Sequence, residues 1–514
     1  MKSPLIALLI LPLLAACGPA PRRAALIVGV EEEPASLDPR IGSDVAAERA
    51  FQMLYRGLFR TGPDFSPEPD LVESCKQSDA THYDFVLKRG IRFSDGHELT
   101  ARDVRFTLLS CLDPRLPSFR KGDLARIDHI DLPGPYELRI TLKEPFAAFL
   151  SGLNVGILQE GAAASSTPVG CGPYRLRDWV PGQWLVFEAN PYAAEPPSSP
   201  TVAFKVIPDP VVRALELRRG SVDLVVNDLP PDSLDYFKLH GYQVIDRPGS
   251  SYAYIGLNCG RPPLDRADVR RALAFAVDRE ALIRYVMRGF ARPASGLLCP
   301  DNWAYCGEVA SYPHDPDRAR AILDEAGFAP GPDGVRFRLS YKTSQNKVSQ
   351  QIAAAVAQDL DAVGVKLSLQ SLEWGTFYGD VKRGDFDCFG LTWVGITDPD
   401  GIRLRFSSAA FPPDGFNRGR FKNERVDALL EEGTRIPDRQ DRAAIYAKVQ
   451  TLLAQDVPCI SLWYPDAVCV AQRDVRGIRL PPDGNFSFLA AVSRGPDQER
   501  PQEQEEKQRI AGGQ

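Results

Sequence analysis

Residues 335–369 read VRFRLSYKTSQNKVSQQIAAAVAQDLDAVGVKLSL, and this stretch decides the fold class. Apolar residues alternate over 335–339, which predicts a strand, and then recur at helical spacing over 352–363. Gly364 ends the helix, and a second alternating run follows over 365–369. A strand, a helix and a strand joined by short turns form a βαβ unit, whose strands are parallel and whose crossover is right-handed. The stretch therefore predicts an α/β protein.

Similar patterns extend outward from this unit in both directions. Thr100 is the predicted N-cap of a helix, with Asp103 in the capping-box position three residues later. Other strands are predicted at 25–30, 83–87, 138–142, 202–207 and 460–464, and other helices at 211–219, 426–432 and 442–453. At 514 residues the chain is too long for one hydrophobic core, so we expect two or three domains.

The composition is that of a soluble globular protein, with 44% apolar and 25% charged residues. The net charge is -6, and Lys and Arg are spread along the whole length. No basic cluster is present, so nucleic acid is not an expected partner. Residues 496–514 are rich in Gln, Glu, Arg and Gly and almost free of apolar residues, which predicts a disordered tail.

The N-terminus has the order of features that is typical of an exported lipoprotein. Lys2 precedes an apolar run over 5–14 that is too short to be a permanent membrane span. Ala15 and Ala16 then precede Cys17, and this order resembles a lipobox. We expect residues 1–17 to be a signal peptide ending at a lipidated Cys17, whose acyl chains would anchor the protein to a membrane. The alternative is an ordinary signal peptide with a chance cysteine.

Nine cysteines remain after Cys17, so at least one thiol lacks an intramolecular partner. Export permits disulfides. Cys299 and Cys306 flank a short loop and are the preferred pair, followed by Cys459 and Cys469. The spacings are not those of a zinc site and the five histidines are scattered, so no metal site and no cofactor are expected.

Several segments, taken in order, resemble the solute-binding proteins of the peptide and nickel importer family, family 5 of the bacterial extracellular solute-binding proteins. The quoted segments are Ser36-Leu37-Asp38-Pro39, Leu87 to Gly96, Pro168 to Tyr174, Gly220 to Asp223, Val269 to Arg279, Ala319 to Gly327 and Trp393 to Asp400. Each segment alone is weak evidence for the family, but together the segments follow the family order over about nine-tenths of the chain.

The resemblance implies a periplasmic-binding-protein-like fold with two lobes (class II, cluster C) and an extra inserted domain. The implied divisions are domain I at 25–50, 165–258 and 476–495, domain II at 51–164, and domain III at 259–475, with crossings near 258–262 and 474–478. It also implies a monomer in the periplasm or on the cell surface that delivers its ligand to an ABC permease complex. The ligand would be a di- or oligopeptide held in a cleft between lobes that close on it.

The resemblance also indicates candidate ligand-binding residues. Trp374 and Trp393 match the family's two cleft tryptophans, and the peptide binders carry Trp-x-x-Asp where this chain has Trp393, Val394, Gly395 and Ile396. Ile396 cannot neutralise an ammonium group, so either Asp398 replaces the carboxylate or the ligand has no free amine. The remaining candidates are Ser43, Tyr252 and Tyr464.

Three alternative functions remain at this point. An amine-free solute such as an oligosaccharide follows from Ile396. A nickel chelate belongs to the same family, but no histidine follows His314. An exported hydrolase is disfavoured because no catalytic motif of the common hydrolase classes is present.

Overall fold

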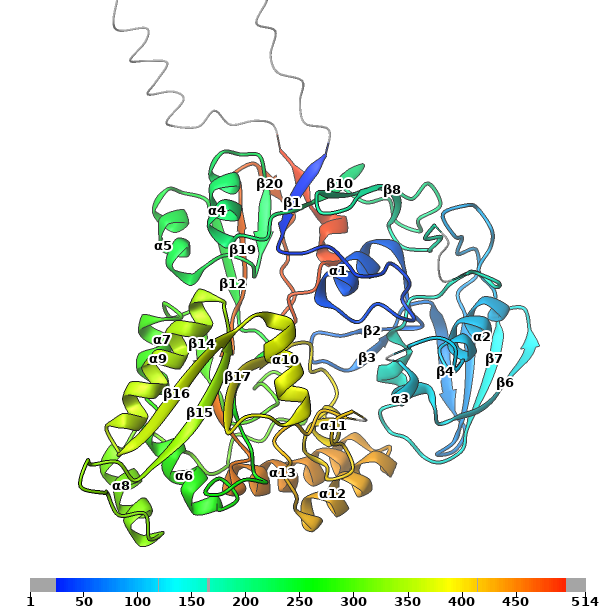
Figure 1. Ribbon diagram of the computed structural model, residues 1–514. Coiled ribbons are helices and arrows are strands. Elements are labelled where there is room, and N and C mark those ends of the chain that lie inside the picture. Colours follow the sequence, from blue (N-terminus) through cyan, green and yellow to red (C-terminus); the bar gives the residue numbers. More distant parts are fainter. Residues whose placement is uncertain (1–24, 119, 164–166, 414, 496–514) are drawn as a thin grey trace, which may run out of the picture.

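The computed structural model describes residues 25–118, 120–163, 167–413 and 415–495, and shows two lobes with a smaller domain beside them (Figure 1). The expected signal peptide, Cys17 and the C-terminal tail lie outside the described residues. Each lobe is built on its own mixed sheet, with helices on both faces, and the inserted domain has a third sheet. The prediction of a two-lobed α/β protein is therefore confirmed.

The first lobe contains a seven-stranded sheet. In order across the sheet its strands are β12 (Gln243–Arg247), β19 (Ala467–Ala471), β11 (Leu224–Val226), β1 (Leu26–Val30), β10 (Thr201–Val206), β9 (Trp184–Ala189) and β8 (Tyr174–Val180). The central strand β1 is parallel to both of its neighbours. Ile27 packs towards α4 (Pro210–Arg218) and α5 (Pro231–Leu239), whereas Val28 packs towards α1 (Val45–Leu54) and η2 (Ser487–Ala491). Because successive side chains of a strand point to opposite faces, both faces of this sheet are buried.

The second lobe contains a six-stranded sheet. Its strands in order are β14 (Ala291–Pro293), β18 (Cys459–Pro465), β13 (Tyr252–Leu257), β17 (Cys388–Trp393), β15 (Phe337–Ser344) and β16 (Val365–Leu372). The predicted βαβ unit is confirmed, because β15 and β16 are parallel with Phe337 opposite Val365. The helix between them is α9 (Lys347–Asp361).

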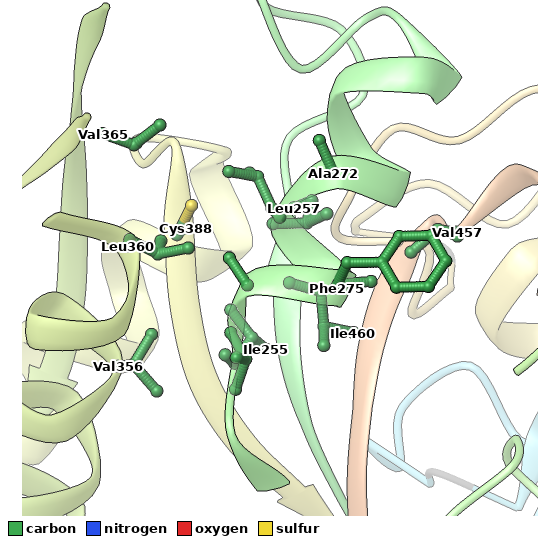
Figure 2. Close-up of a cluster of buried hydrophobic side chains, with 14 of the residues drawn as sticks. Ile255, Leu257, Ala272, Phe275, Val356, Leu360, Val365, Cys388, Val457 and Ile460 are labelled. Carbon is green, nitrogen blue, oxygen red and sulfur yellow. The ribbon is translucent and has the colours of Figure 1, made fainter. Parts of the chain in front are cut away.

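Helices cover both faces of the six-stranded sheet. One face carries α9 with α6 (Ala267–Ala276), α7 (Arg279–Tyr285) and α8 (Pro316–Glu325). Figure 2 shows this core, where Val356 and Leu360 of α9 and Phe275 of α6 pack on Ile255 and Ile460 of the sheet. The other face carries α10 (Trp374–Arg383), α11 (Gly401–Phe406), α12 (Glu424–Arg435) and α13 (Arg439–Asp456).

The inserted domain has a four-stranded antiparallel sheet. Its strands in order are β4 (Val72–Gln77), β5 (His82–Leu87), β7 (Glu137–Leu142) and β6 (Ile127–Gly134), accompanied by α2 (Ala101–Ser110), α3 (Lys121–Leu124) and η1 (Leu150–Asn154). Thr100 and Asp103 form the predicted capping box at the start of α2. A short hairpin of β2 (Phe59–Thr61) and β3 (Pro67–Pro69) carries Phe65, whose side chain is buried in a cluster of the second lobe.

The chain passes between the lobes at positions that differ from the predicted crossings. Strand β13 pairs with β17 and β18, so the first crossing lies at residues 248–251, before the predicted 258–262. Strand β19 pairs with β11 and β12, so the second crossing lies at Asp466, before the predicted 474–478. The two crossings are adjacent, because a Cβ on Gly249 would lie 2.1 Å from the carbonyl oxygen of Pro465. After β19 the chain forms a short antiparallel pair of strands, β20 (Val475–Arg476) and β21 (Ser493–Arg494).

The predicted disulfides are not present, since all nine cysteines within the described residues are free thiols. Cys299 is buried in an apolar cluster, while the thiol of Cys306 faces the carbonyl of Glu308. Cys459 and Cys469 belong to different sheets, on opposite sides of the second crossing. Within the described ranges, no helix is both long enough and apolar enough to cross a membrane.

Candidate functional site

A cavity of about 1080 Å³ lies between the two lobes, and we call it the interlobe cavity. The first lobe contributes the ends of its central strands and α1, and the second lobe contributes the end of β17 and the segment after it. Residues on both sides of the second crossing also line it. This volume is slightly above the ~300–1,000 Å³ that is usual for small-molecule sites.

The wall on the first lobe is acidic. Glu31 and Glu32 follow the carboxyl end of β1, and Asp228 lies just beyond the end of the adjacent parallel strand β11. Asp228 forms a bidentate ion pair with Arg49, with distances of 2.6 and 3.0 Å between the guanidinium nitrogens and the carboxylate oxygens. Glu31 and Glu32 have no ion pair among the described residues. Burial, and then the charge of Asp228, raise the pKa of Glu31 above its ordinary value. This wall therefore presents carboxylates that a cationic group can neutralise.

Glu33, the third glutamate of the run, has a structural role. Its carboxylate accepts hydrogen bonds from the Trp179 ring nitrogen at 3.1 Å and from the Gly182 amide at 2.9 Å. Ser43 lines the cavity as predicted, and Asp44 beside it caps α1 by accepting a hydrogen bond from the Ala47 amide at 2.7 Å. Glu31 and Glu32 are thus the carboxylates of the β1 end that remain free for a ligand.

The wall on the second lobe carries one cation. Thr392, Val394 and Thr397 reach the cavity from the end of β17 and the loop after it, and Arg405 reaches it from α11. Because side chains alternate along a strand, the ring of Trp393 points away from Thr392 and Val394. Trp393 packs instead with Tyr254, at 6.1 Å between ring centroids, and it does not line the cavity.

Asp398, the predicted replacement for the family's amine-binding carboxylate, does not line the interlobe cavity. It forms an ion pair with Arg442 of α13, at 2.6 Å and 3.1 Å, and accepts a hydrogen bond from Ser151 of the inserted domain at 3.1 Å. The Asp398 side chain is only 14% exposed and is not part of the cavity lining. Ile396 is buried in the apolar core of the lobe. The sequence placed both residues in one motif with Trp393, but the fold turns all three away from the cavity.

The two predicted tryptophans are connected through other side chains. The Trp374 ring is exposed and stacks on Tyr378 at 5.6 Å. The guanidinium of Arg418 lies 5.0 Å from the Tyr378 ring and 4.2 Å from the Trp393 ring. Arg405 lies at 4.2 Å from the ring of Trp393 as well. The tryptophans therefore belong to one cation–π stack that supports Arg405.

Tyr252 and Tyr464 are core residues. Each is at most 1% exposed, and the Tyr252 ring stacks on Tyr254 at 5.6 Å. The Tyr464 hydroxyl donates to the carbonyl of Leu298 at 2.6 Å. Tyr252 lines a separate pocket of about 240 Å³ within the second lobe. Neither residue lines the interlobe cavity.

Asp466 forms part of the cavity wall at the second crossing. Burial raises its pKa to about 6, with Arg292 acting in the opposite direction and Asp246 in the same direction. The nearest contact to Arg292 is 3.9 Å, and one carboxylate oxygen has no hydrogen-bond partner. An ionisable group thus lies at the point about which the lobes are joined.

Sequence reasoning missed Glu31, Glu32, Arg405 and Asp466. A signal was available for the glutamates, because three acidic residues directly follow the apolar strand at 25–30 and ligands favour the carboxyl edge of parallel strands. No comparable signal existed for Arg405 or Asp466. Within the described part of the chain, no group of three or more His, Cys, Asp or Glu side chains is arranged to hold a metal ion.

Comparison with known proteins gives consistent results. Residues 66–411 match the sequence model of the "Bacterial extracellular solute-binding proteins, family 5 Middle". The oligopeptide-binding protein AppA of Bacillus subtilis is 28% identical over 486 residues, which is 89% of each chain. The glutathione-binding protein GsiB of Salmonella choleraesuis is 26% identical over 91% of this chain and 94% of its own.

Solved structures show the same fold over almost the whole chain. AppA of B. subtilis with a nonapeptide superimposes with a TM-score of 0.80 at 27% identity, covering 92% of this chain and 99% of AppA. NikZ of Campylobacter jejuni with Ni(L-His) gives a TM-score of 0.81 at 25% identity, covering 92% of this chain and 99% of NikZ. The predicted periplasmic-binding-protein-like fold is therefore confirmed.

Proposed function

The chain belongs to the bacterial extracellular solute-binding proteins of family 5, and from this premise we propose that it captures peptides in the interlobe cavity for an ABC importer. One observation carries the proposal: the cavity of about 1080 Å³ is shared by two lobes that are joined at adjacent crossings. Such an arrangement encloses a solute when the lobes close. The protein acts by binding and release and leaves the solute chemically unchanged.

The acidic wall supports a ligand with a free amine. Glu31 and Glu32 face the cavity without a cation of their own, so an α-ammonium group is stabilised beside them. They take the role that the sequence assigned to Asp398, which is already paired with Arg442. An amine-free oligosaccharide would leave these carboxylates without a partner inside the closed cavity, at a cost in free energy.

The N-terminal leader and the family together support two further parts of the proposal, lipid anchoring and delivery to a permease. Residues 14–17 read Leu-Ala-Ala-Cys, and acylation of Cys17 would hold the protein at a membrane surface outside the cytoplasm. From there it would deliver peptides to the permease. Mass spectrometry of the N-terminal peptide of the membrane-bound protein tests this step, with Cys17→Ser as the variant that should lose the lipid.

The binding test uses native mass spectrometry and calorimetry with a random tripeptide library, free or N-acetylated. We expect the free library to bind about tenfold or more tightly than the acetylated one, because a charge-assisted hydrogen bond is lost on acetylation. Glu31→Gln with Glu32→Gln should remove that preference, whereas Glu73→Gln, on the exposed side of β4, should not. Failure of both libraries to bind the unaltered protein would refute peptide capture.

A further inference from the structure

Arg405 is a cation on the cavity wall that no carboxylate neutralises. It extends from α11 and donates one hydrogen bond, to the carbonyl oxygen of Gly401 at 2.8 Å. Its Nε is buried without a hydrogen-bond partner, and no ion pair to it occurs among the described residues. Burial lowers the pKa of Arg405 to about 10, and the nearby charge of Arg418 acts in the same direction. At neutral pH the side chain is therefore still a cation.

The two carboxylates closest to Arg405 in sequence already form ion pairs with other arginines. Asp400 forms a two-pronged ion pair with Arg403, at 2.9 and 2.7 Å, and Asp398 forms one with Arg442. Both carboxylates of the segment are thus paired with other arginines, whereas Arg405, which reaches the cavity, has no ion pair among the described residues. Arg405 therefore differs from an arginine that is held in place by a structural salt bridge.

Arg418, close enough to act on the charge of Arg405, is a second cation that forms no ion pair with the described residues. Arg418 is 6% exposed, and its partners are hydroxyl groups, those of Tyr254 at 3.3 Å and Tyr378 at 2.8 Å. Arg405 and Arg418 each lie 4.2 Å from the ring of Trp393. The ring offsets part of the cost of desolvating two cations but cannot neutralise them. An anion entering the cavity at Arg405 would be attracted by both.

We propose that Arg405, supported by Arg418 and Trp393, binds a carboxylate group of the ligand. The planar guanidinium suits a carboxylate because its donors match the two oxygens. This inference rests on the proposed function and deepens it: the ligand is a dipolar molecule whose amine faces Glu31 and Glu32 on the first lobe. Its carboxylate faces Arg405 on the second lobe, so that the bound ligand attracts both lobes across the closed cavity.

The test compares tripeptide libraries with free and amidated C-termini on the purified protein and on Arg405→Gln, Arg405→Lys and Arg425→Gln. Arg425 is exposed on α12 and is the matched control for loss of one positive charge on the same lobe. We expect the unaltered protein and Arg425→Gln to bind the free library about 10- to 100-fold more tightly than the amidated one. Arg405→Gln should bind both libraries within about threefold, and Arg405→Lys should be intermediate.

The melting temperature without ligand shows whether the Arg405→Gln substitution affects folding stability as well as binding. Removing an unpaired, partly buried cation should leave the melting temperature of Arg405→Gln close to that of the unaltered protein, whereas loss of a structural salt bridge would lower it. Equal binding of the free and amidated libraries by the unaltered protein would overturn the inference and leave peptide capture standing. Equal loss of both libraries in Arg405→Gln would also overturn it.

If neither library binds the unaltered protein, peptide capture is wrong and sodium acetate becomes the probe of Arg405. A rise in melting temperature with sodium acetate over sodium chloride at equal ionic strength, abolished by Arg405→Gln, would support a carboxylate site independently of peptides. No difference between the two salts would overturn the inference as well.

Discussion

Replacing Asp398 by Asn should destabilise the fold and leave ligand affinity almost unchanged. The side chains of Arg442 and Asp398 are 5% and 14% exposed, with 2.6 Å between the closest nitrogen and oxygen. Asn keeps the shape and can still accept from Ser151, but it removes the charge. Burial acts to lower the pKa of Arg442, yet the Asp398 carboxylate raises it above its ordinary value. Without that carboxylate the buried guanidinium has no ion pair among the described residues.

The magnitude follows from the charge separation. Two unit charges about 4 Å apart at an effective dielectric constant of about 20 interact by roughly 4 kcal/mol. Breaking a buried pair by removing one partner costs about 3–5 kcal/mol. For a cooperative unit of about 200 residues, this corresponds to a fall in melting temperature of roughly 6–12 °C.

Thermal unfolding and peptide calorimetry on the same preparations provide the measurement. Asp441→Asn, an exposed carboxylate in the first turn of α13, is the control and should change the melting temperature by about 1 °C or less. The double variant Asp398→Asn with Arg442→Gln should recover part of the lost stability, because no uncompensated charge remains. If Asp398→Asn instead keeps its melting temperature and loses peptide affinity tenfold, Asp398 contacts the ligand and the reasoning from the ion pair is refuted.

Three further outcomes are expected. The raised pKa of Asp466 means that protonation favours the folded state, so its contribution is complete below about pH 4 and is lost as the pH rises through about 6. Asp466→Asn should therefore be more stable than the unaltered protein at pH 7.5 by up to about 2–3 kcal/mol in urea unfolding, and equal to it near pH 4; a constant difference across this range would exclude the titration. Phe65→Ala removes a ring buried in the second lobe and should lower the free energy of unfolding by about 3 kcal/mol. Amide exchange in the β2–β3 hairpin should become faster. Unchanged exchange would show that the Phe65 ring does not hold the hairpin against the second lobe. Thiol titration in denaturant without reductant should count nine cysteines beyond Cys17, and a count of seven would indicate a disulfide.

Local sequence patterns determined the secondary structure. The alternation and helical spacing over 335–369 predicted two parallel strands and the helix between them, because these patterns depend only on neighbours a few residues apart. The cap at Thr100 was readable for the same reason, since a capping box joins residues only three positions apart. The ordered motifs also indicated the family and its two lobes.

Only the tertiary structure decided which polar groups line the interlobe cavity. Asp398 and Arg442 are 44 residues apart, and nothing in either segment reveals that they meet. The same holds for Glu31 and Arg405, which reach one cavity from different lobes, and for Cys459 and Cys469, which are close in sequence but belong to different sheets. The physical reason is that a buried charge is neutralised by whichever partner the folded chain brings within a few ångströms, and that partner is set by packing between elements and not by spacing along the chain.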